Sequence, residues 1–266
     1  MEVIKAHQCF EVVDGGLKFV YTRVLFHKDG ITFCAISLNR NTDSAICADQ
    51  LKDIKAIPPE AYRPVLPPGC IIAPDPNRCY IKQPNLMSFG TGVDLASLVL
   101  QELAACEVIR KHPHLNIAKY YGCAVSDGRV TGLCFKWYPE TLMDKINPGR
   151  LNKSTFISSN DRTAARKMAV RYLSGIEEAV RQLHALGLVH NDINPANVMI
   201  TEDDRPVLID FDSTCAPGTA LDKTKRTYGW FDPDVRVSRE RNDLDALAEL
   251  NVWLTGSSPD CFQFKE

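Results

Sequence analysis

The chain has 266 residues, of which 45% are hydrophobic, and a formal net charge of −2 at pH 7. This length and apolar content allow one or two sizeable cores. The near-neutral charge argues against nonspecific binding to nucleic acids or anionic membranes. No apolar run is long enough for a transmembrane helix, and the start of the chain has no basic region followed by an apolar core, so we expect no membrane span and no signal peptide.

The first 60 residues contain apolar segments separated by Asp14-Gly15 and Asp29-Gly30, which predicts β-hairpins. These hairpins either belong to the main β region or form an appended unit. Residues 48–56 are expected to form a short helix. A proline-rich connector with Gly69 alone follows over residues 57–78 and is expected to be a stiff spacer.

Next, residues 79–82 predict a short strand that ends in Lys82. Asp94 is expected to cap a helix over residues 95–111, because apolar residues recur there at steps of three and four. Glu102 lies on this helix, where it could pair with Lys82. The alternative is that both are ordinary solvated surface residues.

A hairpin is predicted where residues 120–125 and 132–137 flank the dipeptide Asp127-Gly128. Residues 164–186 show helical spacing and end at Gly187.

The most informative segment runs from Leu188 to Asp212. Asp192 and Asn197 lie on a loop, because Pro195 between them prevents a regular helix. Short strands over residues 198–200 and 206–209 then return Asp210 to the neighbourhood of Asn197. Oxygen ligands of this kind suit Mg²⁺, and Asp192 is then available to accept a proton or orient an attacking hydroxyl.

The sequences His190-Asn191-Asp192, with Asn197, and Asp210-Phe211-Asp212 resemble the H-R-D-x-x-x-x-N and D-F-G motifs of the protein-kinase superfamily. The resemblance covers roughly residues 82–254. Short kinase-like proteins of filamentous fungi, with similar His-Asn-Asp and Asp-Phe-Asp versions, are the nearest match expected.

This resemblance implies a two-lobed α+β fold with a β-rich N-lobe and a shortened α-helical C-lobe. Residues 1–60 would be a β-hairpin region of, or appended to, the N-lobe. Residues 61–136 would form the kinase N-lobe, and residues 137–266 a C-lobe truncated after the helix that carries Asp243.

The resemblance also implies an ATP- and Mg²⁺-dependent phosphotransferase, a serine/threonine protein kinase that acts on a protein hydroxyl. The ten cysteines are scattered singly, and Cys34, Cys106, Cys123 and Cys134 lie in apolar patterns, which indicates reduced core residues of a cytoplasmic or nuclear protein. The charge favours no nucleic-acid or membrane partner, and the oligomeric state is unknown. The implied catalytic residues are Asp192 on the nucleophile, Lys82 on the phosphates, Glu102 orienting Lys82, and Asn194. The implied cofactor-binding residues are Lys82, Phe135, Lys136, Tyr138, Asn197 and Asp210. The implied metal ligands are Asn197, Asp210 and Asp212, while Thr227 favours serine or threonine substrates.

The sequence also departs from the family pattern. No G-x-G-x-x-G precedes Lys82, so ATP affinity is expected to be weak. Asn191 replaces the arginine that binds the phosphorylated activation loop in the family pattern. Activation by phosphorylation of that loop is therefore not expected. Asn194 replaces a lysine that neutralises charge on the transferring phosphoryl group. Losing one such donor reduces transition-state stabilisation by about 3–4 kcal/mol. Asp212 replaces a glycine and either binds a second cation or repels the phosphates.

Two alternatives stay open. A small-molecule kinase of the aminoglycoside or choline type shares the H-x-D-x-x-x-x-N pattern. A pseudokinase that binds partners without turnover would explain the missing glycine loop and Asn194.

Overall fold

The computed structural model describes residues 1–40, 46–159, 162–222 and 224–264. The chain forms two compact units. The first consists of Met1–Val65 and Gln83–Val99, and the second of Leu66–Lys82 and Leu100–Glu266. The boundaries predicted at residues 60 and 136 concern the kinase lobes, and they stay a prediction.

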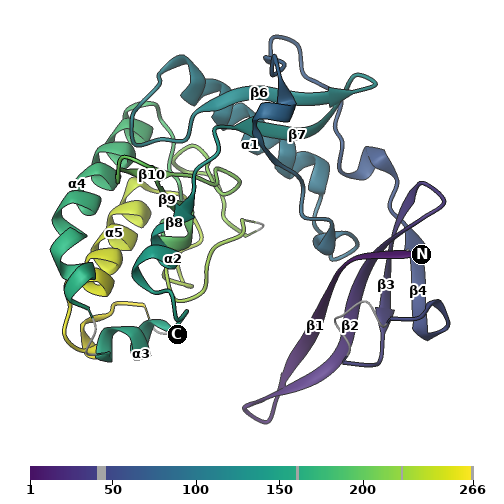
Figure 1. The fold of residues 1–266 in the computed structure, drawn as a ribbon, viewed down its shortest axis with the longest axis horizontal. Helices are drawn as coiled ribbons and strands as arrows, with labels where there is room; N and C mark the ends of the chain where they lie inside the picture. Colours follow the sequence, from purple (N-terminus) through teal and green to yellow (C-terminus); the bar gives the residue numbers. More distant parts are fainter. Residues whose placement is uncertain (41–45, 160–161, 223, 265–266) are drawn as a thin grey trace. The chain divides into compact units, whose positions relative to one another are not determined.

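The first unit contains a four-stranded antiparallel sheet in the order β1-β2-β3-β4 (Figure 1). Its strands are β1 (Glu2–Val13), β2 (Gly16–Lys28), β3 (Ile31–Ser37) and β4 (Leu51–Ala56). Asp14 and Asp29 each have a φ of 51°, and each precedes a glycine with positive φ. Such turns match the twist of paired strands, so the predicted hairpins are confirmed.

The helix expected over residues 48–56 is wrong. Residues 48–50 form a single 3-10 turn, and Leu51–Ala56 is strand β4. Here Lys52 pairs with Ile36, and Leu51, which pairs with Ser37, becomes buried. Pairing with a distant strand therefore outweighed the local helix preference.

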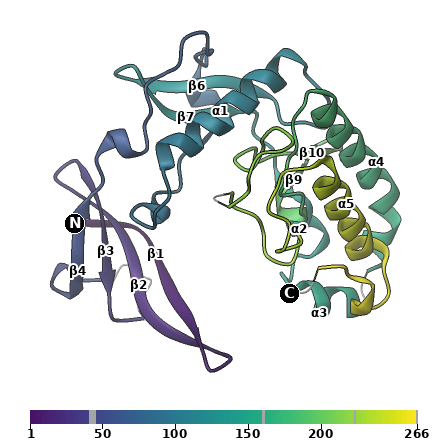
Figure 2. The ribbon, with the colours of Figure 1, turned by 180° about the vertical axis from the view of Figure 1, so that it is seen from behind.

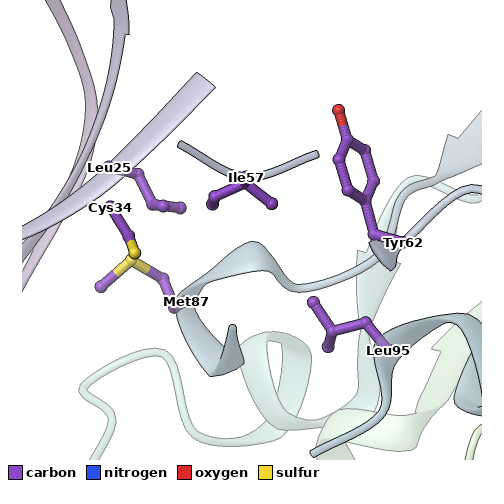
Figure 3. Close-up of a cluster of buried hydrophobic side chains, with 6 residues drawn as sticks. All are labelled: Leu25, Cys34, Ile57, Tyr62, Met87 and Leu95. Carbon is purple, nitrogen blue, oxygen red and sulfur yellow. The ribbon is translucent and has the colours of Figure 1, made fainter. Parts of the chain in front are cut away.

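A buried apolar cluster joins this sheet to the residues that follow it (Figure 3). Its members are Leu25, Cys34, Ile57, Tyr62, Met87 and Leu95. The cluster explains why residues 83–99 belong to the same unit as the sheet.

The second unit begins with a three-stranded antiparallel sheet in the order β5-β7-β6. Its strands are β5 (Tyr80–Lys82), β6 (Tyr120–Ser126) and β7 (Arg129–Phe135), with the predicted Asp127-Gly128 turn between β6 and β7. Helix α1 (Leu95–Lys111) enters this unit at Leu100.

The chain before β5 lies along the opposite edge of this sheet. The Cys123 N–H donates to the Ile71 carbonyl at 2.8 Å, and the Ala73 N–H donates to the Cys123 carbonyl at 2.9 Å. Gly122 allows this approach, because a Cβ there would lie 2.6 Å from the Ala73 nitrogen. Residues 71–73, which precede β5, therefore pair with β6 and not with β5.

The rest of the unit is mainly helical. It contains α2 (Leu142–Ile146), α3 (Lys153–Ser158), α4 (Thr163–Ala185) and α5 (Glu240–Thr255). A small sheet in the order β10-β9-β8 completes it, with β8 (Glu140–Thr141), β9 (Val198–Ile200) and β10 (Pro206–Leu208). Both views show α4 and α5 side by side (Figures 1 and 2). Helix α4 matches the helix predicted over residues 164–186 and ends before Gly187, whose φ is 72°.

None of the helices in the described ranges is sufficiently long and apolar to span a membrane. Cys34, Cys106, Cys123 and Cys134 are buried and form no disulfide.

Candidate active site

Lys82 is the last residue of β5 and lies at the centre of a charged cluster. Its Nζ is 2.7 Å from Glu102 Oε1, forms a second ion pair with Asp210 Oδ1, and is 3.9 Å from Asp212 Oδ2. Three carboxylates therefore surround one ammonium group.

Glu102 reaches this cluster because the apolar face of α1 is buried. Leu95, Val99, Leu103, Cys106 and Ile109 recur at helical spacing and are almost fully buried. The helix begins after Asp94, whose carboxylate accepts the Ser97 N–H at 3.1 Å. Glu102 is itself only 6% exposed and also accepts the Phe211 N–H at 3.2 Å. It therefore links α1 to β5 and to the segment around Asp210.

The Asp192 carboxylate is buried and held by four donors. Oδ1 accepts the Thr227 N–H at 2.8 Å and Asn194 Nδ2 at 3.2 Å. Oδ2 accepts the Thr227 hydroxyl at 3.0 Å and Asn197 Nδ2 at 3.0 Å. Asn194 thus makes a hydrogen bond to Asp192 at the position where the family pattern has a lysine. With both oxygens engaged, Asp192 is fixed in one orientation.

Asp243, in the first turn of α5, holds the backbone at His190 and Asn191. Its carboxylate accepts the N–H groups of His190 and Asn191, both at 2.8 Å, and it is fully buried. His190 also accepts the Asp192 N–H at Nδ1 and bonds the Ile209 carbonyl through Nε2. Because a carbonyl can only accept, Nε2 is the donor in this hydrogen bond.

Asn191 is 5% exposed and acts as a hydrogen-bonding centre. Its Nδ2 donates to the Ser213 carbonyl at 3.2 Å and to Ser238 Oγ at 3.1 Å, while its Oδ1 accepts from Asn242 at 3.0 Å. These neutral hydrogen bonds hold the segment after Asp212 against the loop.

Asp210 adopts a left-handed backbone conformation with φ of 66°, which turns its side chain towards Lys82. The preceding Ile209 N–H donates to the Asn197 carbonyl at 3.0 Å, so β9 and β10 bring Asp210 beside Asn197 as the hairpin pattern predicted. Phe211 is fully buried between the rings of Phe135 and His190, at centroid distances of 6.4 and 5.8 Å.

Burial and the neighbouring charges act in opposite directions on several groups of the cluster. Burial raises the pKa of Glu102 to about 7, although the Lys82 ammonium opposes this shift. Burial also raises the pKa of Asp212, and the neighbouring Asp210 carboxylate adds to the effect. For Asp210, burial is outweighed by Lys82, and the pKa falls. Burial likewise opposes the charged form of Lys82, but the three carboxylates prevail and its pKa rises. The site therefore has an excess of acidic groups, which suits a cation.

A pocket of about 310 Å³ opens beside Lys82 and Asp210. Besides these two, its lining consists of Tyr80, Ala118, Phe135, Lys136, Trp137, Tyr138, Thr141, Met199 and Ile209. A mainly apolar slot with a charged end is typical of a site for a small molecule with an aromatic and an ionic part.

The family model that describes the protein kinase domain matches residues 86–256, which is more than half of the chain. The chain belongs to the protein kinase family. The fold described above is accordingly the two-lobed α+β kinase fold. Lys82 lies just outside the matched residues, so its place in the kinase site depends on the geometry given above.

Several protein kinases resemble parts of the chain. The probable serine/threonine-protein kinase samkA of Dictyostelium discoideum is 32% identical over 141 residues, which cover 49% of this chain and 20% of that kinase. The serine/threonine-protein kinase AfsK of Streptomyces coelicolor is 50% identical over 100 residues, covering 34% of this chain and 12% of that kinase. The chain spans about a fifth or less of the length of these relatives. The expected likeness to fungal proteins stays a prediction.

The kinase structure brings most of the predicted site residues together. Lys82, Glu102, Asp210 and Asp212 form the charged cluster, and Asp192, Asn194 and Asn197 share hydrogen bonds. Phe135, Lys136 and Tyr138 line the pocket. No three His, Cys, Asp or Glu side chains in the described part of the chain gather into a metal-binding group, but that criterion leaves out the Asn197 amide.

Sequence analysis missed six pocket residues of this kinase: Tyr80, Ala118, Trp137, Thr141, Met199 and Ile209. One signal was available for Tyr80. It precedes Lys82 by two positions on a strand, so both side chains point to the same face.

The segment before Lys82 also bears on the missing glycine-rich loop. Among the described residues, β5 pairs only with β7, and residues 71–73 pair with β6 at the other edge of the sheet. Within the described residues of the second unit, no glycine-rich hairpin therefore pairs with β5.

The raised pKa of Glu102 predicts a pH-dependent stability. A carboxyl whose pKa is higher in the folded state than in the unfolded state stabilises the fold below its unfolded pKa of about 4.5, and this contribution is lost as the pH rises through about 7. The free energy of unfolding of the wild type, relative to Glu102→Gln, should therefore decrease by up to about 3 kcal/mol between pH 4.5 and 8. Urea unfolding of both proteins across this range measures the difference. A difference that does not vary with pH would show that Glu102 titrates normally.

Proposed function

We propose that this chain is an ATP- and Mg²⁺-dependent serine/threonine protein kinase of atypical sequence. One observation carries the proposal. Lys82, Glu102 and Asp210 form an ion-pair cluster at the charged end of an apolar pocket, and the fixed carboxylate of Asp192 belongs to the same unit.

The pocket fits a purine nucleotide. Its apolar part, with Tyr80, Phe135, Tyr138 and Met199, provides surface for a base, and Lys82 at its charged end can bind phosphate oxygens. Tyr80 and Lys82 lie two residues apart on one face of β5, so the aromatic and charged ends are separated by about 7 Å along the strand.

Asn197, Asp210 and Asp212 would hold Mg²⁺, since amide and carboxylate oxygens are the ligands this ion prefers. The acidic excess of the cluster supports this assignment, because three carboxylates surround the Lys82 ammonium. Mg²⁺ would supply charge neutralisation at the phosphates. Both hydrogen bonds of Asn197 to Asp192 use Nδ2, so neither occupies its oxygen.

Asp192 would orient the substrate hydroxyl and accept its proton. Thr227, which donates two hydrogen bonds to Asp192, favours serine or threonine, and the names of the relatives agree with this choice. Asn194 contacts Asp192 without adding positive charge, so we expect turnover to be slow.

Tyr80 provides a direct test of the base-binding end. Replacing an aromatic stacking partner with alanine costs about 1–3 kcal/mol per base, so Tyr80→Ala should weaken nucleotide binding by about tenfold or more. Tyr80→Phe keeps the ring and should bind as the wild type does. Calorimetric titration with Mg·ATP measures both affinities. Because Tyr80 is more than half exposed, we expect Tyr80→Ala to stay folded, so that the change in affinity reports on the binding contact.

The function itself is tested by phosphoryl transfer from γ-labelled ATP to a serine/threonine peptide library and to a metabolite panel. The proposal predicts label on peptides and its loss when magnesium is chelated. Label on aminoglycosides or choline alone would establish a small-molecule kinase. Nucleotide binding without transfer to either panel would establish a pseudokinase.

Action in the cytoplasm or nucleus on a protein partner completes the proposal. It is checked by locating a tagged full-length protein in its own cells and by identifying the phosphorylated proteins that disappear when it is removed.

A further inference from the structure

A second ion pair, away from Lys82, lies completely inside the helical part of the second unit. Lys153, the first residue of α3, is 3% exposed, and Glu249 on α5 is fully buried. Lys153 Nζ contacts Glu249 Oε1 directly. Removing two such charges from water costs several kcal/mol per ion, and apolar side chains of similar size would be at least as stabilising. The pair therefore suggests a task that apolar residues cannot perform.

Both side chains of the pair make hydrogen bonds to backbone groups of other segments. Lys153 Nζ donates to the Gly229 carbonyl at 2.5 Å and to the Phe264 carbonyl at 3.0 Å. Glu249 accepts the Gln263 N–H at 2.9 Å and the Phe264 N–H at 3.2 Å. The pair thus connects two helices to the backbone of two segments that have no regular structure at these residues.

Aromatic rings surround the ammonium group and keep water away from it. The Trp230 ring centroid is 4.9 Å from Lys153 Nζ, and the Phe262 centroid is 4.3 Å away. Both distances are within cation–π range. Trp230 belongs to the same turn as Gly229, so the pair holds this turn through a hydrogen bond and through a ring.

The turn leads directly to Asp192. Within residues 227–230, which we call the 227–230 turn, the Trp230 N–H donates to the Thr227 carbonyl at 3.0 Å. Thr227 then donates its N–H and its hydroxyl to the two oxygens of Asp192. A continuous set of contacts therefore runs from Glu249 and Lys153 through the turn to the proposed catalytic carboxylate.

We infer that the Lys153–Glu249 pair is a positioning unit, which fixes the 227–230 turn together with residues 262–264 and, through Thr227, sets the orientation of Asp192. Neither residue of the pair lines the pocket beside Lys82. Its effect on turnover rests on the proposed kinase function, but its effect on the turn does not.

The test replaces the pair by apolar residues of similar size in the double variant Lys153→Met/Glu249→Leu. We expect this variant to stay folded, and we expect the 227–230 amides to exchange hydrogen for deuterium about tenfold faster or more. We expect kcat for a peptide to fall by about tenfold to a hundredfold, with the Kd for Mg·ATP changed less than about twofold. Lys167→Met, the same change at an exposed lysine of α4, is the control and should match the wild type.

A folded double variant with unchanged exchange in the turn and unchanged kcat would overturn the inference. If the variant does not fold, the wild type still decides. The Thr227, Trp230, Gln263 and Phe264 amides should then exchange together as one slow group, and faster exchange of the turn than of residues 263–264 would overturn the coupling. A wild type that shows this grouping but transfers no phosphoryl group would contradict the proposed function alone.

Discussion

Asp192→Asn is expected to lower kcat for phosphoryl transfer to a peptide by about a hundredfold to ten-thousandfold, the usual contribution of a positioned acid–base group. The structure gives the reason. Both oxygens of Asp192 accept hydrogen bonds from donors, and an asparagine would turn one of its own donors towards them. The measurement is steady-state kinetics with saturating Mg·ATP.

Asp127→Asn is the matched control for this variant. Asp127 is an exposed turn residue with φ of 52°, a conformation that asparagine also tolerates. It should show wild-type kinetics. Asp192→Asn should still bind Mg·ATP, and a variant that binds it and transfers at the wild-type rate would remove Asp192 from the proposed role.

Lys82→Met is the second variant with a large expected effect. It removes the ammonium that contacts Glu102 and Asp210 and leaves these carboxylates without this ion-pair partner. We expect transfer to fall by about a hundredfold to a thousandfold, as for the loss of one preorganised electrostatic donor. The protein should also lose stability, more at pH 8 than at pH 6, because protonation of Glu102 relieves the repulsion only at the lower pH.

Thermal unfolding at both pH values and a transfer assay measure these effects, with Lys167→Met as the control. Equal destabilisation at both pH values would contradict the electrostatic explanation. Wild-type transfer by Lys82→Met would contradict the role proposed for the lysine.

The parts of the fold that depend on local signals were predictable. Helix α1 follows from the three- and four-residue spacing of its apolar side chains, and the β6–β7 hairpin follows from Asp127-Gly128. The arrangement of Asp192, Asn197 and Asp210 was predictable for a similar reason, since a short hairpin returns the chain within a few residues.

Features that depend on distant pairing were not predictable. Residues 51–56 form β4 because β3 lies beside them, which no local pattern reveals. The Lys153–Glu249 pair joins residues 96 positions apart, and each residue resembles an ordinary charged side chain of a surface helix in the sequence. The apolar lining from Met199 and Ile209 is likewise a product of the assembled fold.

The central claim is that Lys82, Asp210 and the neighbouring pocket bind Mg·ATP, and calorimetric titration of Mg·ATP into the wild type and Asp210→Asn tests it most directly. We predict binding to the wild type that depends on Mg²⁺ and that weakens by about tenfold or more in Asp210→Asn, in line with the loss of a charged ligand. Asp127→Asn should bind as the wild type does. A wild type that binds no nucleotide, or that binds ATP equally well without Mg²⁺ and after the Asp210 substitution, would contradict the account.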